Sequence, residues 1–361
     1  MDTFKLLKTL CETDAPSGYE AQIAPIVQEL WEPYTDAVTT DRVGSLIAIK
    51  HGRAPEPRPR LLLAAHMDEI GLMVTQVVEQ GGNGFLRVTN VGGIDRRQVY
   101  AQLVTVHGRK ELPGVIGCLP PHLLPDDRSD KAYGYEDLVI DLGLPLAEVA
   151  ANVAIGDYVS FRQPLRKLLG QRVSGKALDN RASVAAVTIC LEYLHGRTHD
   201  WDVVAVATAQ EETRLLGAYT SAFSQRPDAA IAIDVTFGKG PATNDENTFE
   251  LGSGPTLDIG PNVHPGIYKA LQEAAESLEM NVNTGTHSRY SGTDAFGLQI
   301  ARDGIPTGLV GIPLRYMHTV VESVDIKDVE RTGRLLGEFI IRLDTEFIPK
   351  ITAAMMEEDK S

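Results

Sequence analysis

The stretch LLLAAHMDEIG, residues 61–71, joins the pattern of a buried strand to a group of reactive side chains. Its first five residues are all apolar, as in a strand that is covered on both faces of a sheet. The apolar run then ends in His66, Asp68 and Glu69, and Gly71 follows. Because ligands bind at the carboxyl ends of strands in an open α/β sheet, the stretch predicts a functional site at this end.

The chain on either side of this stretch alternates between strand and helix patterns. Short apolar runs predict strands at residues 45–50, 60–66, 201–210, 229–234 and 305–313. Helical periodicity predicts helices at residues 2–12, 20–31, 179–195, 265–279 and 324–345. Strands that alternate with helices indicate an α/β sheet that is packed on both faces.

Residues 72–163 follow a different pattern, with short β-type runs separated by Gly and Pro and little helical periodicity. This pattern is typical of a small barrel or sandwich. We therefore predict two domains. A discontinuous catalytic α/β domain comprises residues 1–71 and 164–361, and a β-rich domain is inserted at 72–163. Within the insert, residues 119–137 predict a loop.

Composition restricts both the partners and the compartment. The formal net charge is −15, which argues against a nucleic-acid partner because phosphate binding needs a basic surface. Cys11, Cys118 and Cys190 are far apart and odd in number, so they predict neither a disulfide framework nor a CxxC metal site. No signal-peptide pattern opens the chain, and no apolar window reaches the length of a membrane helix. We expect a soluble cytoplasmic protein that does not bind membranes.

Other strand ends carry metal-binding residue types as well. Glu211 and Glu212 follow the run at 201–210, Asp234 ends the run at 229–234, and His318 comes shortly after the last predicted strand. Each of these residues has an ordinary explanation alone, since an aspartate often caps a helix and an acidic pair is often solvated.

Together these residues point to metal chemistry. Several carboxylates that converge on one place repel each other unless a cation neutralises them. Asp179, just before a predicted helix, adds a further carboxylate. Two histidines and three carboxylates suit Zn²⁺, Co²⁺ or Mn²⁺, and they can hold two ions if one carboxylate bridges.

Six short motifs give the sequence a family resemblance. The motifs are AAHMDEIG (64–71), GKALDNR (175–181), AQEE (209–212), AID (232–234), SGTDA (291–295) and IPLRYMH (312–318). With them the sequence resembles the cytoplasmic, co-catalytic dinuclear metallo-aminopeptidases that include the glutamyl aminopeptidases and the tetrahedral (TET) peptidases. The resemblance implies a mixed-sheet α/β catalytic domain of the phosphorylase/hydrolase-like type with an inserted β-barrel dimerisation domain.

The resemblance implies a metal site with five ligands. His66 and Asp234 would hold one divalent ion, Glu212 and His318 would hold the other, and Asp179 would bridge them. Zn²⁺ or Co²⁺ is expected, with Mn²⁺ as a further possibility. The implied activity is removal of N-terminal residues from short peptides.

The resemblance assigns two further residues to catalysis. Glu211 would be the general base that accepts a proton from the attacking water, and Asp68 would orient His66. Residues i and i+2 of a strand face the same side, so Asp68 can reach His66 and fix its tautomer. Neighbouring residues point to different sides, so Glu211 and Glu212 can serve different roles.

The family also implies dimers that pair through the inserted domain and build a tetrahedral dodecamer. Some motif positions depart from the family pattern: Thr213-Arg214 follows the glutamate pair, Ser253 replaces a lysine, and Thr319-Val320 follows His318. These departures leave the preferred N-terminal residue open. Two alternatives remain, an endoglucanase-like glycoside hydrolase and an inactive binding or scaffold homologue. A glycosidase needs two carboxylates but no histidines, and a decayed site would have lost a ligand.

Overall fold

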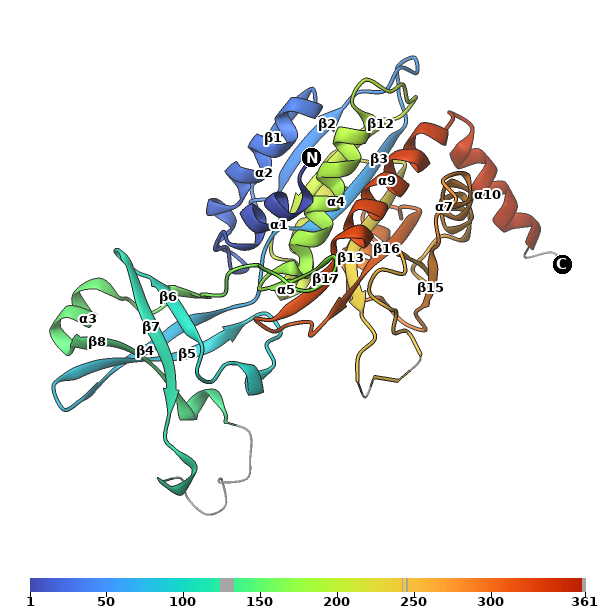
Figure 1. The fold of residues 1–361 in the computed structure, drawn as a ribbon. Coiled ribbons are helices and arrows are strands. Elements are labelled where there is room, and N and C mark those ends of the chain that lie inside the picture. Colours follow the sequence, from blue (N-terminus) through green and yellow to red (C-terminus); the bar gives the residue numbers. More distant parts are fainter. Residues whose placement is uncertain (124–132, 242, 245, 359–361) are drawn as a thin grey trace.

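The computed structural model describes residues 1–123, 133–241, 243–244 and 246–358, which form a large mixed sheet and a closed barrel (Figure 1). The strands of the large sheet are β1 (Ala37–Thr40), β2 (Leu46–Lys50), β3 (Arg60–His66), β10 (Arg166–Lys167), β11 (Arg172–Gly175), β12 (Asp202–Thr208), β13 (Ala229–Phe237), β14 (Thr256–Ile259), β15 (Asn283–Thr286), β16 (Thr307–Arg315) and β17 (Glu322–Asp325). The barrel strands are β4 (Gly71–Gln80), β5 (Asn83–Val91), β6 (Leu103–His107), β7 (Glu111–Cys118), β8 (Leu138–Pro145) and β9 (Tyr158–Phe161).

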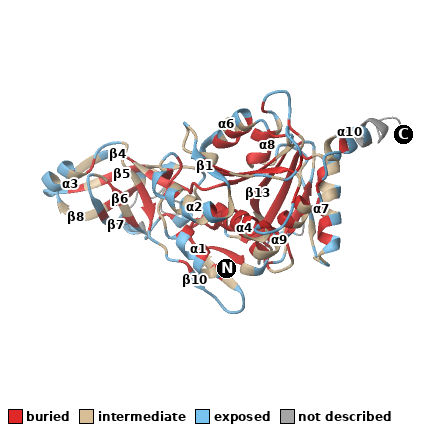
Figure 2. Cartoon of the chain, turned by 90° about the horizontal axis from the view of Figure 1, so that it is seen from above, coloured by how far each residue is buried: buried red, intermediate tan, exposed pale blue. Residues whose placement is uncertain are grey.

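Helices cover the large sheet, as Figures 1 and 2 show. Helices α1, α2, α4, α7, α9 and α10 contribute buried residues to one hydrophobic cluster, whereas α6 and α8 contribute to another. The helices are α1 (Thr3–Cys11), α2 (Ala24–Trp31), α3 (Leu146–Asn152), α4 (Leu178–Leu194), α5 (Glu211–Arg214), α6 (Leu216–Gln225), α7 (Pro265–Ser277), α8 (Asp294–Gln299), α9 (Ile326–Arg342) and α10 (Phe347–Glu358).

The middle of the sheet is parallel. Strands β12, β3, β13 and β16 lie side by side in that order and run in the same direction, so their carboxyl ends meet at one edge. Strand β2 pairs antiparallel with β12, and β14 and β17 pair antiparallel with β16. The observed mixed α/β sheet with a closed antiparallel barrel confirms the predicted fold class.

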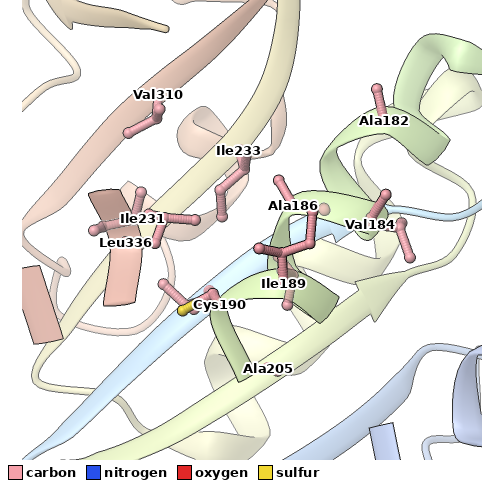
Figure 3. Close-up of a cluster of buried hydrophobic side chains, with 14 of the residues drawn as sticks. Ala182, Val184, Ala186, Ile189, Cys190, Ala205, Ile231, Ile233, Val310 and Leu336 are labelled. Carbon is pink, nitrogen blue, oxygen red and sulfur yellow. The ribbon is translucent and has the colours of Figure 1, made fainter. Parts of the chain in front are cut away.

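The apolar residues of β3 alternate between the two sides of the sheet. Leu61 and Leu63 belong to the larger cluster, which includes the buried face of α4, and Leu62 belongs to the smaller cluster. Figure 3 shows part of the larger cluster, with Ile189 and Cys190 of α4 and Ile231 and Ile233 of β13 among the labelled side chains. The continuous apolar run in the sequence therefore reflects a strand that is covered on both faces.

The barrel has its own apolar core, which Figure 2 shows as buried residues well away from the large sheet. Its strands run from Gly71 to Phe161, close to the predicted insert. The division of the chain into functional domains at 71/72 and 163/164 stays a prediction. The predicted loop at 119–137 falls largely on residues 124–132, which lie outside the described residues.

Several boundaries differ from the sequence expectation. The predicted helix at 20–31 begins as a 3₁₀ turn (Glu20–Gln22) before α2, and the first residues of the predicted helix at 324–345 form the end of β17. Asp325 caps α9 by accepting a hydrogen bond from the Lys327 amide at 3.0 Å, which fixes the boundary there. Among the described residues, no helix is long and apolar enough to cross a bilayer.

Candidate active site

The predicted site residues meet at the carboxyl edge of the parallel strands. His66 is the last residue of β3, and Asp234 lies near the end of β13, two strands that are neighbours in the sheet. Glu211 and Glu212 open helix α5 directly after β12. Two residues outside the strands complete the group: Asp179 lies at the start of α4, and His318 follows β16. All six predicted metal or base residues are therefore brought together.

His66 occupies the centre of this group. Its Nε2 atom lies 3.1 Å from Asp179 Oδ1, 3.7 Å from Glu211 Oε2 and 3.9 Å from Asp234 Oδ1. The His66 side chain is only 2% exposed, and its three partners come from three separate segments of the chain. Three carboxylates thus converge on one imidazole nitrogen. One of them lies at hydrogen-bond distance, and the other two lie slightly farther away.

Asp179 lies between the two histidines. Its Oδ1 atom faces His66, while its Oδ2 atom lies 3.5 Å from His318 Nε2. The same His318 nitrogen is 3.8 Å from Glu212 Oε2. The two oxygens of one buried carboxylate therefore point to two different sets of metal-binding side chains.

The donor set fits a divalent cation. Two groups of residues have all their donor atoms within 4.8 Å of one another: His66, Glu211 and Asp234 form one, and His66, Asp179 and Glu212 form the other. Imidazole nitrogens combined with carboxylate oxygens suit Zn²⁺, Co²⁺ or Mn²⁺. These groups place His66 in both sets and include Glu211, whereas the sequence assigned His66 to one ion and Glu211 to none.

Electrostatics at the site favour a bound cation as well. Burial raises the pKa of Asp234 and of Glu212 to about 8, and it raises the pKa of Glu211 well above the ordinary value. Burial alone would also raise the pKa of Asp179, but hydrogen bonds with His318 and His66 lower it. Several buried carboxylates repel one another when ionised, and a bound cation would relieve this repulsion.

Asp68 supports the site in two ways. It is fully buried, and its Oδ1 atom lies 3.4 Å from His66 Nδ1, as the strand geometry predicted. The same carboxylate accepts hydrogen bonds from the backbone amides of Glu211, at 3.2 Å, and Glu212, at 3.1 Å. Sequence reasoning missed this second contact, because both glutamates begin a short helix and do not continue strand β12.

Glu322 is a supporting residue that the sequence analysis did not identify. Its side chain is 1% exposed and accepts hydrogen bonds from the backbone amides of Asp179 and His318, both at 2.9 Å. His318 adopts a left-handed backbone conformation with φ of 60°, which is uncommon for a non-glycine residue. Glu322 is the first residue of β17, a four-residue strand of sequence ESVD, so no apolar run marked it in the sequence.

Glu69, to which the sequence gave no clear role, belongs to a buried ion pair behind the site. Its two oxygens each lie 2.7 Å from Lys176 Nζ, and one of them also accepts a hydrogen bond from the Ala15 amide at 2.9 Å. Lys176 contacts Asp14 at 2.9 Å as well. The segment around residues 14–17 is thereby held against the end of β3.

A cavity of about 310 Å³ opens onto the convergent side chains. His66, Asp179, Glu211 and Asp234 form part of its lining. His287 also lines it, together with residues of β13 and β14. The cavity gives a small ligand access to the carboxylates and to His66.

Comparisons with known proteins identify the family. The model of the M42 glutamyl aminopeptidase family matches residues 44–335. The lysyl aminopeptidase of Pyrococcus furiosus is 35% identical over 341 residues, which cover 93% of this chain and 96% of that protein. An aminopeptidase structure from the archaeon Desulfurococcus kamchatkensis has a TM-score of 0.89 at 33% identity, with 97% of each chain covered.

A second solved structure, the TET1 peptidase of Pyrococcus horikoshii, gives a TM-score of 0.83 at 30% identity. The match covers 95% of this chain and 100% of that one, and that peptidase can assemble into a tetrahedron or a large octahedral shell. The matches span the α/β sheet and the barrel together. The chain therefore belongs to the M42 glutamyl aminopeptidase family of peptide hydrolases, as its sequence motifs predicted.

Proposed function

We propose that this chain is a dinuclear metal-dependent aminopeptidase that removes single residues from the N-terminus of short peptides. The observation that carries the proposal is the position of Asp179 between His66 and His318, with one oxygen directed at each. A bridging carboxylate in a two-metal hydrolytic site needs this arrangement. Family membership supports the reaction class.

Five residues are proposed as ligands. His66 and Asp234 would hold one ion, Glu212 and His318 the other, and Asp179 both. Glu211 lies closer to His66 than Asp234 does, at 3.7 Å against 3.9 Å. We nevertheless keep Glu211 outside the ligand set, because the reaction needs a carboxylate that is free to accept a proton.

The proposed chemistry divides between the ions and the protein. Two bound divalent cations would lower the pKa of a water molecule and polarise the scissile carbonyl. Glu211 lines the cavity beside His66 and would accept the proton of that water, then donate it to the leaving amine. Asp68 holds the backbone of Glu211 and contacts His66, so it fixes the base relative to the ligands.

Location and assembly are further parts of the proposal. All three cysteines are free thiols, which suits a reducing cytoplasm. We propose that the barrel, residues 72–163, pairs two chains and that such dimers form larger shells. The assembly reported for the Pyrococcus horikoshii peptidase supports this expectation by analogy. Sedimentation of the purified chain as a monomer would contradict it.

The proposed base is tested by Glu211→Gln, with metal content measured on the same sample. We expect kcat to fall by about 10²–10⁴-fold, because general-base catalysis contributes about that much. Glu276→Gln, on the exposed face of α7, is the matched control and should keep the wild-type rate. A Glu211→Gln variant that holds two ions and cleaves at the wild-type rate would show that Glu211 is not the base.

The same preparations test the two alternatives. Complete chelation should abolish cleavage of aminoacyl substrates, and Zn²⁺, Co²⁺ or Mn²⁺ should restore it. Cellulose-hydrolysing activity that survives metal removal would favour the glycoside hydrolase. Fewer than two ions per chain, with no peptidase activity after metal addition, would favour the inactive homologue.

A further inference from the structure

The cavity beside the proposed ligands has walls of mixed character. Phe237, Phe249 and Leu309 supply apolar surface, and Asp258 supplies a carboxylate on the same lining. None of these four residues belongs to the proposed catalytic set. A long side chain with an apolar stem and a polar end matches such walls, since lysine and arginine bury their methylene groups and leave the charged end for a polar partner.

Asp258 has an unused acceptor. It lies on β14 and is 3% exposed. Its Oδ2 atom is 3.1 Å from His287 Nε2, whereas Oδ1 is buried and accepts no hydrogen bond from any residue that the structure describes. Leaving a buried carboxylate oxygen without a donor is costly, so a donor supplied by a ligand would stabilise it.

Gly285 leaves room for this oxygen. Asp258 and Gly285 are paired residues on the parallel strands β14 and β15, and both line the cavity. A Cβ atom at position 285 would lie only 1.9 Å from Asp258 Oδ1. Any larger residue there would displace the carboxylate, so glycine at this position is required for its placement.

The sheet register places Asp258 within reach of a substrate side chain. Asp234, Gly311 and Thr256 form one row across β13, β16 and β14, and Asp258 lies two residues beyond Thr256 on the same face. Two strand spacings and two residue rises separate the Cα atoms of Asp234 and Asp258 by about 12 Å. A lysine side chain spans about 6 Å from Cα to Nζ, which leaves room for the substrate backbone near Asp234.

We propose that Asp258 determines substrate specificity by accepting a hydrogen bond from the charged side chain of an N-terminal lysine or arginine. The proposal rests on the aminopeptidase function above and names its substrate class. His287 donates to Oδ2, which leaves Oδ1 to accept from the ligand. Peptides that begin with an acidic residue would place two carboxylates together, so they would be disfavoured. Family membership does not decide which N-terminal residue is preferred. The family is named for glutamyl aminopeptidases, whereas the Pyrococcus furiosus relative is a lysyl aminopeptidase.

The wild-type test compares lysyl, norleucyl and glutamyl chromogenic substrates on the metal-loaded enzyme. Norleucine has the lysine stem without the ammonium group, so the lysyl/norleucyl ratio of kcat/KM isolates the charge contact. We expect this ratio to be about ten to one hundred, the range for a hydrogen bond to a charged group. A ratio of one or less, or a preference for the glutamyl substrate, would overturn the proposal.

Asp258→Asn tests the residue itself. The expected result is a lysyl/norleucyl ratio at least tenfold below that of the wild type, whereas Asp303→Asn, an exposed aspartate elsewhere, should keep it. An unchanged ratio in Asp258→Asn would refute the role of Asp258. Because the ratio is internal to each protein, partial loss of metal or of folded enzyme does not affect it. Failure of the proposed function would look different, as absence of cleavage of every substrate by the metal-loaded wild type.

Discussion

The buried ion pair between Lys176 and Glu69 offers a quantitative test of how the site is supported. Lys176→Met keeps an unbranched side chain of similar length and removes the charge. Glu69 is 2% exposed, so the substitution leaves a buried carboxylate whose remaining close donor is the Ala15 amide at 2.9 Å. Arg181, at 3.9 Å, is too far for a hydrogen bond.

The expected cost is about 3 kcal/mol in the free energy of unfolding. Removal of one partner from a buried pair costs about 3–5 kcal/mol, and we take the lower end because the Ala15 amide and the Arg181 charge remain. The double variant Lys176→Met/Glu69→Gln removes the uncompensated charge and retains the oxygen that accepts from Ala15. We therefore expect it to be more stable than Lys176→Met alone by about 1–2 kcal/mol.

Urea titration followed by tryptophan fluorescence measures these values, because Trp31 and Trp201 are both fully buried. The wild type, the single variants Lys176→Met and Glu69→Gln, and the double variant are compared at saturating metal, with Lys110→Met as an exposed-lysine control. A loss below about 1 kcal/mol for Lys176→Met would refute the reasoning. So would a double variant whose destabilisation equals the sum of the two single effects, since that result would mean no coupling between the residues.

Other contacts near the site give three shorter predictions. Glu322→Gln can accept from only one of the amides of Asp179 and His318, so metal affinity measured by chelator competition should fall about ten- to hundredfold; an unchanged affinity would contradict this. Removing the metals should lower the thermal midpoint as well as the activity, because the buried carboxylates lose their counter-charge; calorimetry with and without chelator tests this. Burial alone would raise the pKa of Asp14, but hydrogen bonds with His107 and Lys176 hold it below its ordinary range. The stability from this carboxylate is therefore present above the unfolded-state pKa of about 4 and is lost as pH falls through the lower folded value, so the deficit of Asp14→Asn should be full at pH 7 and shrink below about pH 4; a constant deficit would exclude the linkage.

Most of the residues that sequence reasoning located share one property, which is their position at the end of a long apolar run. His66 and Asp234 lie in the later parts of strands of seven and nine residues, and the glutamate pair comes just after a strand of seven. A central parallel strand of this kind is easily recognised from its composition. Parallel neighbours place their ends at the same edge, so the residues could be grouped before any distance was known.

Residues on short or irregular elements were not found. Asp258 and Glu322 lie on β14 and β17, two strands of four residues each that pair with a distant part of the chain. Four residues are too few to define a periodicity, and the partners of these carboxylates are fixed only by tertiary contacts. The second role of Asp68 was hidden for a similar reason, since it depends on where the chain turns into α5 after β12.

The inserted barrel is attached to the sheet by two connections: one starts just after His66, and the other enters the sheet at β10 and β11, ahead of Asp179. β4 begins five residues after His66, and β11, on the return path, ends four residues before Asp179. These two side chains are 113 positions apart in the sequence, yet their Nε2 and Oδ1 atoms are 3.1 Å apart. The barrel is thus joined by short stretches of chain to both partners of this contact, so contacts made by the barrel with other chains would bear on the alignment of the two residues.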